Sequence, residues 1–316
     1  MIKDTSPRFG LGLQAASDRM KKTGLSELST TVAQVAARLG ARKVLAIHGA
    51  TPEELQIEYK VEAAMTPRTV ADLESGKKGK AVLRRWQPGI TINEEETGLE
   101  EGREGKGRAD YDPLDGTSSY ALGQRYSTVG LSISDTSGRI KSSAIVNPFE
   151  RELLVAEDGG GTWLFPLDDR LAIAGEGKEL KVEQKTSFKG EIVYVDALFN
   201  EQTSDPKFGF MQDLLGLGVV GFRMTGSNID QQQKVATGKA NFGITDAKGG
   251  VFDLAPGGFG IVMAGGDMVD VQTGEVPTSK TEVVIYGSPE LVRIALPYAQ
   301  RRYENYKGFT AKAKKK

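Results

Sequence analysis

The sequence predicts a protein of mixed α+β and α/β class, and two observations support this expectation. Three strand-like segments follow one another with short connections, which favours an antiparallel sheet; they cover 126–134, 142–147 and 152–157. Farther along, two apolar runs enclose a helical pattern, which favours a strand–helix–strand unit; its parts cover 191–197, 207–216 and 218–223. We therefore expect two halves: 1–150, with the antiparallel sheet, and 151–316, with α/β architecture.

Four further elements are expected before residue 100: a helix over 25–39, a strand over 54–62, a helix over 69–86, and a strand over 89–96 that runs into an acidic loop. Apolar residues at helical spacing indicate the first helix, and Gly40 is its expected stop. Strict alternation indicates the first strand. Gly76 and Gly79 weaken the second helical pattern, because glycine is unfavourable inside helices.

The second half contains three more predicted elements: a helix over 228–237, a Gly-rich start of a helix within 252–266, and a closing helix over 289–303. The C-terminal end, "KGFTAKAKKK", is basic and short. We expect this tail to be disordered, as chain ends without apolar anchors commonly are.

The composition excludes several classes of protein. The chain has 316 residues and a formal net charge of −1, so no overall field attracts nucleic acid or acidic membranes. It has no cysteine and one histidine, His48, which excludes disulfides and thiolate metal sites and leaves almost no route to zinc. No apolar run is long enough to span a membrane, and the N-terminus lacks the apolar core of a signal peptide. We expect a cytoplasmic protein without a membrane or nucleic-acid partner.

Acidic side chains gather in three short segments: 94–96 ("EEE"), Asp112 with Asp115 in "DPLDGT", and Asp253 in "VFDLAPGG". Taken singly, these segments are typical of a solvated loop, a turn and a helix cap. Taken together, carboxylates from three segments without histidine or cysteine are the oxygen ligands that Mg²⁺ prefers, and Mg²⁺ commonly shares its remaining positions with substrate phosphate. The sequence therefore predicts a magnesium-dependent phosphate site.

The order of residues in "DPLDGT" suits that chemistry. Pro113 fixes the backbone after Asp112, so that the next carbonyl and the Asp115 carboxylate can turn toward one point. Gly116 removes a side chain where a phosphate would approach closely. The N–H groups after it could hold phosphate oxygens, and the Thr117 hydroxyl could orient a water molecule.

Several motifs, in their order along the chain, resemble those of the inositol monophosphatase superfamily: "INEEE", "DPLDGTSSYALG", "RMTGS", "KVATG" and "FDLAPGG". The resemblance runs from about Thr69 to about Leu296, with "TVAD" and "GSPEL" near its ends. It implies a layered α-β-α-β-α sandwich, with the active site in a cleft between the antiparallel sheet and a smaller mixed sheet. The superfamily also includes fructose-1,6-bisphosphatases, bisphosphate nucleotidases and histidinol-phosphatases.

The resemblance implies two or three Mg²⁺ ions, for which Mn²⁺ can substitute. Their ligands would be Glu94, Asp112, the Leu114 carbonyl, Asp115 and Asp253, with Glu95 and Asp72 near an outer ion. The catalytic residues would be Glu94, Thr117 and Asp115. The substrate phosphate would meet Gly116, Thr117 and Ser118, and the alcohol part would meet Gly226, Ser227 and an acidic position that falls at Thr245 or Asp246. Most metal ligands thus lie in the first half, and Asp253 and the alcohol pocket in the second.

The implied activity is hydrolysis of inositol-1-phosphate or fructose 1,6-bisphosphate by a metal-activated water, without a covalent phosphoenzyme. A 3′-phosphoadenosine 5′-phosphate nucleotidase and a histidinol-phosphatase are the alternatives within the superfamily. A non-catalytic member that binds protein or RNA is the alternative of another class. The resemblance further implies lithium sensitivity and a homodimer or homotetramer. The chain departs from the family pattern in three places. Phe252 stands where the family usually has tryptophan, and "APG" at 255–257 where it usually has Ala-Ala-Gly. The segment 228–234 ("NIDQQQK") stands where the family has small and apolar residues.

Overall fold

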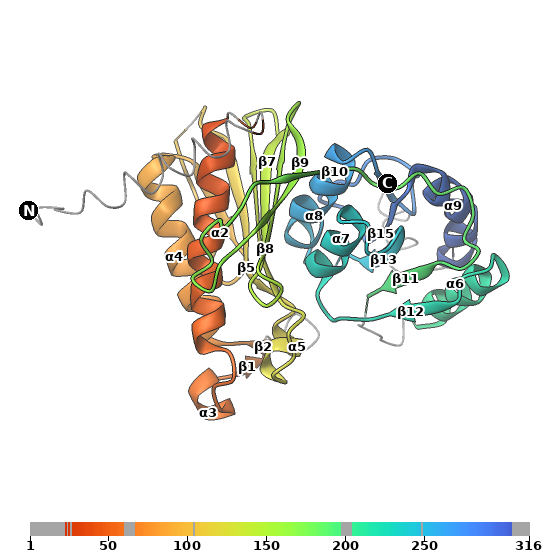
Figure 1. Ribbon diagram of the computed structural model, residues 1–316, viewed down its shortest axis with the longest axis horizontal. Helices are drawn as coiled ribbons and strands as arrows, with labels where there is room; N and C mark the ends of the chain where they lie inside the picture. Colours follow the sequence, from red (N-terminus) through yellow and green to blue (C-terminus); the bar gives the residue numbers. More distant parts are fainter. Residues whose placement is uncertain are drawn as a thin grey trace, which may run out of the picture.

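The computed structural model describes residues 23, 25, 27–59, 67–103, 105–196, 204–247 and 249–304. Its helices are α2 (Leu28–Ile47), α3 (Pro52–Leu55), α4 (Val70–Trp86), α5 (Thr117–Ala121), α6 (Ser204–Gly216), α7 (Asn228–Ala236), α8 (Val251–Met263) and α9 (Pro289–Tyr303). They enclose two sheets in five layers (Figure 1): α2 with α4, a large sheet, α7 with α8, a smaller sheet, and α6 with α9. The predicted α-β-α-β-α sandwich is confirmed.

The large sheet has the strand order β10-β9-β8-β7-β6-β5-β3-β4. Its strands are β3 (Thr91–Glu94), β4 (Gly98–Glu100), β5 (Arg108–Asp115), β6 (Thr128–Ser134), β7 (Ile140–Asn147), β8 (Glu152–Glu157), β9 (Gly161–Pro166) and β10 (Lys178–Leu180). All neighbours pair antiparallel except β3 and β5. The predicted antiparallel run is confirmed, and β9 and β10 extend it. Because a division at residue 150 would cut this sheet, we propose that the two halves divide between Leu180 and Ile192.

The smaller sheet has the order β12-β11-β13-β15-β14. Its strands are β11 (Ile192–Val195), β12 (Gly221–Arg223), β13 (Phe242–Asp246), β14 (Asp267–Asp270) and β15 (Val283–Gly287). Strand β11 pairs parallel with both β12 and β13, and β15 pairs antiparallel with its neighbours. Helix α6 joins β11 to β12, so the predicted strand–helix–strand unit is confirmed.

Helix α2 does not stop at Gly40, as the sequence suggested, but continues to Ile47. The reason lies on β5, where the buried Tyr111 ring points at the two outer helices. A Cβ at Gly40 would lie 2.2 Å from the Tyr111 hydroxyl oxygen, and one at Gly79 in α4 would lie 2.4 Å from Tyr111 Cε1. These glycines therefore make room for the tyrosine and do not end or interrupt their helices.

The predicted strand over 54–62 is wrong for 54–57, is confirmed for Glu58 and Tyr59, and for 60–62 lies outside the described residues. Glu54 and Leu55 belong to α3, which begins with a capping box in which Thr51 and Glu54 bond each other's backbone N–H groups. Only β1 (Glu58–Tyr59) is extended, and it pairs with β2 (Pro67–Arg68); residues 60–66 lie outside the described part of the chain. The alternating pattern was overridden by a strong local helix-start signal.

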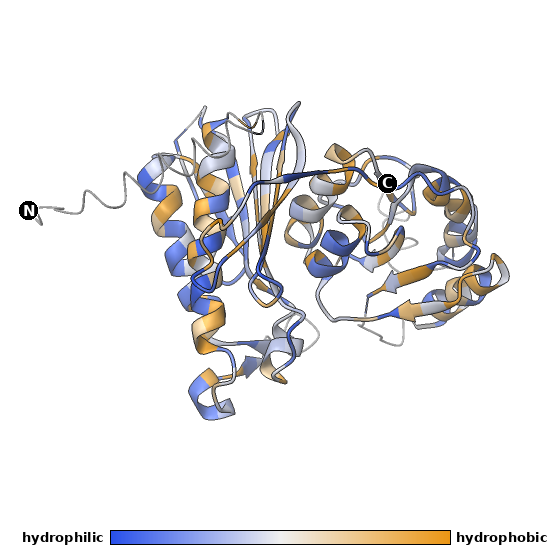
Figure 2. Cartoon of the chain, viewed as in Figure 1, coloured by the Kyte–Doolittle hydropathy of each residue, from blue (hydrophilic) through white to orange (hydrophobic). Residues whose placement is uncertain are grey.

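Helix α8 begins at Val251, so the Gly-rich stretch is itself helical, with Pro256 inside it. Figure 2 shows mainly hydrophobic residues on α8 and strongly hydrophilic ones on α7, although both helices lie in the middle layer. The predicted helices over 69–86, 228–237 and 289–303 are confirmed as α4, α7 and α9. The basic tail lies outside the described residues, and no helix within them is long and apolar enough to cross a membrane.

Candidate active site

The "DPLDGT" segment ends strand β5 and turns the chain into α5. The pairing of β5 with β6 shifts register between Asp112 and Asp115, across Pro113, which cannot donate a ladder bond. Gly116 then takes the left-handed conformation, with φ 82°, which favours glycine. A Cβ there would lie 2.7 Å from Ser227 Cβ. Gly116 is therefore needed for this turn and for the close approach of residue 227, whereas the sequence suggested that it clears space for phosphate.

Three aspartates and Glu95 form an electrostatically coupled group, which we call the acidic cluster: Glu95, Asp112, Asp115 and Asp253. Burial raises the pKa of Asp112 well above its usual range, and the charges of the other three members raise it further. Burial likewise raises the pKa of Asp253, with additional contributions from Asp115 and Glu95. The carboxylates of β5 and α8 are therefore held close enough to one another and to Glu95 for neighbouring negative charges to oppose the ionisation of Asp112 and Asp253.

Helix α7 holds two members of the acidic cluster in place. The Asp115 carboxylate caps this helix: it accepts hydrogen bonds from the backbone N–H of Ile229 (2.7 Å) and Asn228 (3.3 Å) and from the Ser227 hydroxyl. The pKa of Asp115 is about 6, because burial outweighs these bonds. The Asn228 side chain also bonds the Asp253 carboxylate. One helix thus fixes an aspartate from each half of the chain.

The structure also places the Gln232 amide against α8, where its Nε2 donates to the Asp253 carbonyl oxygen at 2.7 Å. A Cβ at Gly257 would lie 2.1 Å from Gln232 Oε1, so this glycine leaves room for the contact. Sequence reasoning missed this pair. The unusual polar run in 228–234 and the glycine after Pro256 were visible in the sequence, but their proximity was not.

Glu94 and Glu95 point to different surroundings. The Glu94 carboxylate is buried, lies 3.3 Å from the Lys80 ammonium group, and accepts hydrogen bonds from Thr97 Oγ1 and the Glu96 N–H. It faces α4, as does its partner across the sheet, Tyr111. The negative charge of Glu95, by contrast, contributes to raising the pKa of all three aspartates of the acidic cluster. The structure thus gives Glu94, the predicted ligand and catalytic residue, an ion-pair partner, and brings Glu95 to the aspartates.

Thr117 and Asp72 form a second link, between α5 and α4. The Thr117 hydroxyl lies 2.9 Å from Asp72 Oδ1 and 2.8 Å from the Leu114 carbonyl oxygen, and it can donate its proton to either. The other Asp72 oxygen completes the capping box of α4 with Thr69. Burial raises the pKa of Asp72 to about 6. Ser118, the next residue, is exposed.

The residues predicted to face the substrate alcohol are mostly engaged with the protein. Ser227 is buried and caps α7 through its own hydroxyl, which accepts from the Asp230 N–H at 3.2 Å. Gly226 packs on Ser119, whose Oγ would lie 2.5 Å from a Cβ there. Asp246 is buried and lies 3.1 Å from the ammonium group of Lys207, a buried cation that the sequence did not single out.

The donor set suits a hard cation in charge and chemistry. Four carboxylates gather without a histidine or cysteine among them. The Leu114 carbonyl, in the same turn as Asp112 and Asp115, accepts from the Thr117 hydroxyl. Among the described residues, however, no three acidic, histidine or cysteine side chains already form a metal cage. The reason is visible at Asp115 and Asp253, whose oxygens accept protein N–H groups, including Gly249 N at 2.6 Å from Asp253. The chemistry of these residues fits Mg²⁺, provided that the Asp115 and Asp253 carboxylates rotate away from the N–H groups that now donate to them.

Next to the acidic cluster, α7 carries an unusual set of buried polar atoms. Asp230 Oδ2 and the amide groups of Gln231 and Gln233 have no hydrogen-bond partner within the described residues. The other Asp230 oxygen accepts from Asn147 Nδ2 at 3.0 Å and lies 3.3 Å from the Lys234 ammonium group. Burial raises the pKa of Asp230 to about 6 despite this pairing.

We predict that Asp230→Asn removes part of the pH dependence of stability. A carboxyl group whose pKa is raised by folding binds more protons in the folded state, so the free energy of unfolding falls as pH rises from about 4 to about 6. A shift of this size corresponds to roughly 3 kcal/mol. Urea unfolding of both proteins at about pH 4.5 and about pH 7.5 should show a smaller decrease in the variant. Parallel pH profiles would contradict this role for Asp230.

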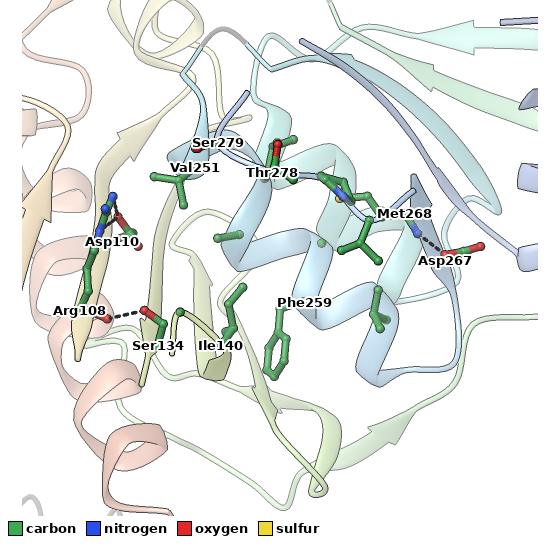
Figure 3. A pocket seen from close by; sticks show the side chains of 17 residues that line it. Arg108, Asp110, Ser134, Ile140, Val251, Phe259, Asp267, Met268, Thr278 and Ser279 are labelled. Atoms are coloured by element: carbon green, nitrogen blue, oxygen red, sulfur yellow. Dashed lines mark hydrogen bonds and ion pairs between the residues drawn. The ribbon is translucent and has the colours of Figure 1, made fainter. Parts of the chain in front are cut away.

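A separate cavity of about 650 Å³ lies beside α8 (Figure 3). Its walls come from β5 to β7, from one face of α8, and from β14 and the segment after it. No member of the acidic cluster lines it. The cavity and the cluster nevertheless share α8, since Val251 and Leu254, which flank Asp253 on that helix, are among the lining residues.

Comparison with known proteins agrees with the fold. The sequence model described as the inositol monophosphatase family matches residues 28–304. The chain is 26% identical over 213 residues to Nus factor SuhB of Pasteurella multocida, which covers 67% of this chain and 74% of that protein. It is 37% identical over 98 residues to the inositol-1-monophosphatase of Mesorhizobium japonicum, covering 31% of this chain and 36% of that one.

Solved structures show the same architecture. The extragenic suppressor protein SuhB from Bartonella henselae superimposes with a TM-score of 0.76 at 21% identity, covering 87% of this chain and 99% of that one. An IMPase from Thermotoga maritima superimposes with a TM-score of 0.71 at 18% identity, covering 86% and 96%. At these identities the likeness establishes the fold alone.

Proposed function

Because the chain belongs to the inositol monophosphatase family, we propose that it is a magnesium-dependent phosphomonoesterase acting on a small sugar or inositol phosphate. The observation that carries this proposal is the acidic cluster, in which burial and the neighbouring carboxylates raise the pKa of Asp112 and Asp253, as expected where several negative charges meet and can attract a cation. Inositol-1-phosphate and fructose 1,6-bisphosphate are the proposed substrates, with manganese able to replace magnesium.

We assign the residues as follows. Glu95, Asp112, Asp115, Asp253 and the Leu114 carbonyl would hold magnesium, which when bound supplies positive charge for the transferring phosphoryl group. The Thr117 hydroxyl donates to Asp72 or to the Leu114 carbonyl, which leaves an oxygen lone pair to accept a proton of the attacking water. Gly116 and Ser118 would offer backbone N–H groups to the phosphate.

A panel assay tests the proposal. We expect phosphate release from inositol-1-phosphate or fructose 1,6-bisphosphate to require magnesium or manganese and to stop in excess EDTA. 3′-Phosphoadenosine 5′-phosphate and histidinol phosphate complete the panel as the alternative substrates. Full activity in EDTA would exclude the metal assignment. No release from any of the four would favour a non-catalytic binding role, a candidate suggested by the relative named Nus factor SuhB.

The two glutamates give a matched test of the assignment. Glu95→Gln should lower turnover by about 10²-fold or more, because a charged member of the acidic cluster is lost. Glu94→Gln should instead lower the free energy of unfolding by about 1–3 kcal/mol, because it weakens the partnering of the buried Lys80 charge. Turnover of folded protein and urea midpoints should be measured for both variants. The reverse pattern would return the ligand role to Glu94.

A further inference from the structure

The cavity beside α8 is bounded on three sides by regular structure. One face of α8 forms its longest wall, with apolar side chains at helical spacing from Val251 to Val262, including the Phe259 ring. Ile140 and Met268 lie on the opposing walls, and Val276 and Pro277 lie on the segment after β14. A concave, mainly apolar space of this volume is typical of small-molecule sites.

The charges at the cavity argue against a second phosphate site. Three charged residues line it: Arg108, Asp110 and Asp267. The arginine is already committed, because its Nε donates to Asp110 Oδ1 at 2.7 Å and its guanidinium forms an ion pair with the same carboxylate. The lining therefore carries a net charge of −1, which disfavours an anion, while the apolar wall disfavours any strongly hydrated group.

The cavity spans a weak point of α8. Pro256 has no N–H and removes one hydrogen bond between the first turn of α8, which carries Asp253, and the rest of the helix. Val251, Leu254 and Ala255 line the cavity before the proline, and Gly258, Phe259 and Val262 line it afterwards. A molecule in the cavity would contact both parts and hold them together.

We propose that this cavity is a binding site for a small, uncharged, largely apolar molecule whose occupation stabilises the Asp253-bearing first turn of α8. The proposal does not depend on the phosphatase assignment, because the binding and the stabilisation can both be measured without magnesium or substrate. It adds to the acidic cluster a second site on the opposite side of the same helix.

Two dyes with one ring system test the class of ligand. N-phenyl-1-naphthylamine is uncharged, and 1-anilinonaphthalene-8-sulfonate carries one negative charge on a comparable frame. Fluorescence titration of the full chain should show saturable binding of one uncharged dye per chain, with the sulfonate bound about tenfold or more weakly. Asp267→Asn should strengthen binding of the sulfonate. Non-saturable binding, or tighter binding of the sulfonate, would overturn the proposal.

Surface variants locate the site without disturbing the core. Val262 and Val276 line the cavity but are 42% and 78% exposed, so a charged side chain at either position should be tolerated. Val262→Glu and Val276→Glu should each weaken the uncharged dye about tenfold. Val220→Glu, the same change at a position 68% exposed outside the cavity, should leave its binding unchanged. Equal effects of all three variants would place the dye elsewhere.

Hydrogen–deuterium exchange tests the stabilisation. With the uncharged dye bound, backbone exchange in 251–259 should slow in the unmodified protein and remain fast in Val262→Glu. Dye binding without slower exchange there would disprove the coupling to α8. If the dye does not bind and Val262→Glu changes the oligomeric mass measured by light scattering, the surface is a contact between copies of the chain, and the proposal is wrong.

Discussion

Asp115→Asn and Asp253→Asn should each reduce phosphate release by about 10²-fold or more. The double variant should be little worse than either single variant. The two carboxylates come from different halves of the chain, yet they belong to one acidic cluster, and α7 hydrogen-bonds both. We propose that both hold the same one of the expected magnesium ions, so that losing either carboxylate disables the same source of charge stabilisation.

The measurement is a double-mutant cycle on kcat/KM with saturating magnesium. Asp169→Asn is the matched control, because this aspartate is 81% exposed and pairs only at the surface, with Arg151. It should leave activity unchanged. Two large losses that multiply in the double variant would show that the aspartates act on separate steps, and the shared-ion assignment would fail.

The same variants should differ in stability without metal. Asp253→Asn should raise the free energy of unfolding, because the charges of Asp115 and Glu95 oppose ionisation of Asp253. Asp115→Asn should raise it less, since the substitution also removes a carboxylate oxygen whose hydrogen bonds from the N-terminus of α7 offset part of the cost of burial. Thermal unfolding in EDTA distinguishes the two, and added magnesium should stabilise only the unmodified protein strongly.

Gly79→Ala should be the most destabilising single-methyl change in α4, by about 3 kcal/mol. Alanine normally favours a helix over glycine by about 1 kcal/mol. Here, however, the new Cβ would lie 2.4–2.6 Å from Cε1, Cζ and the hydroxyl oxygen of Tyr111. That ring is fully buried, and its hydroxyl donates to the Ser75 carbonyl oxygen at 3.2 Å, so it has no free space to enter.

Urea unfolding of three proteins checks this explanation. Gly216→Ala, at a helical glycine with no atom within 4 Å of the new Cβ, is the matched control and should preserve stability or raise it by up to about 1 kcal/mol. Tyr111→Leu should be destabilising alone, but Gly79→Ala added to it should cost at least about 1 kcal/mol less than in the unmodified protein. Additive losses would mean that α4 tolerates the methyl group by moving.

Local pattern was sufficient to predict much of this fold. The strand-like segments that became β6 to β8 and the helical segments that became α4, α7 and α9 are short-range signals, and the structure confirms each of them. The alternation in 54–62 failed where a Thr51–Glu54 capping box satisfied the backbone more strongly. Gly40 does not end its helix. It leaves room for the side chain of Tyr111, which lies far away in the sequence.

The sequence by itself determined which chemical groups are available to this protein: carboxylates in three segments, no thiol and one histidine. Only the tertiary structure decided which carboxylates meet. Adjacent residues at a strand end face opposite sides, so Glu94 turns to Lys80 while the charge of Glu95 reaches Asp112. Likewise, only the tertiary structure places the buried Asp246 carboxylate beside the buried Lys207 ammonium group. The physical reason is that a side chain's partner depends on the face it occupies and on which distant segment packs there, and neither is encoded in local spacing.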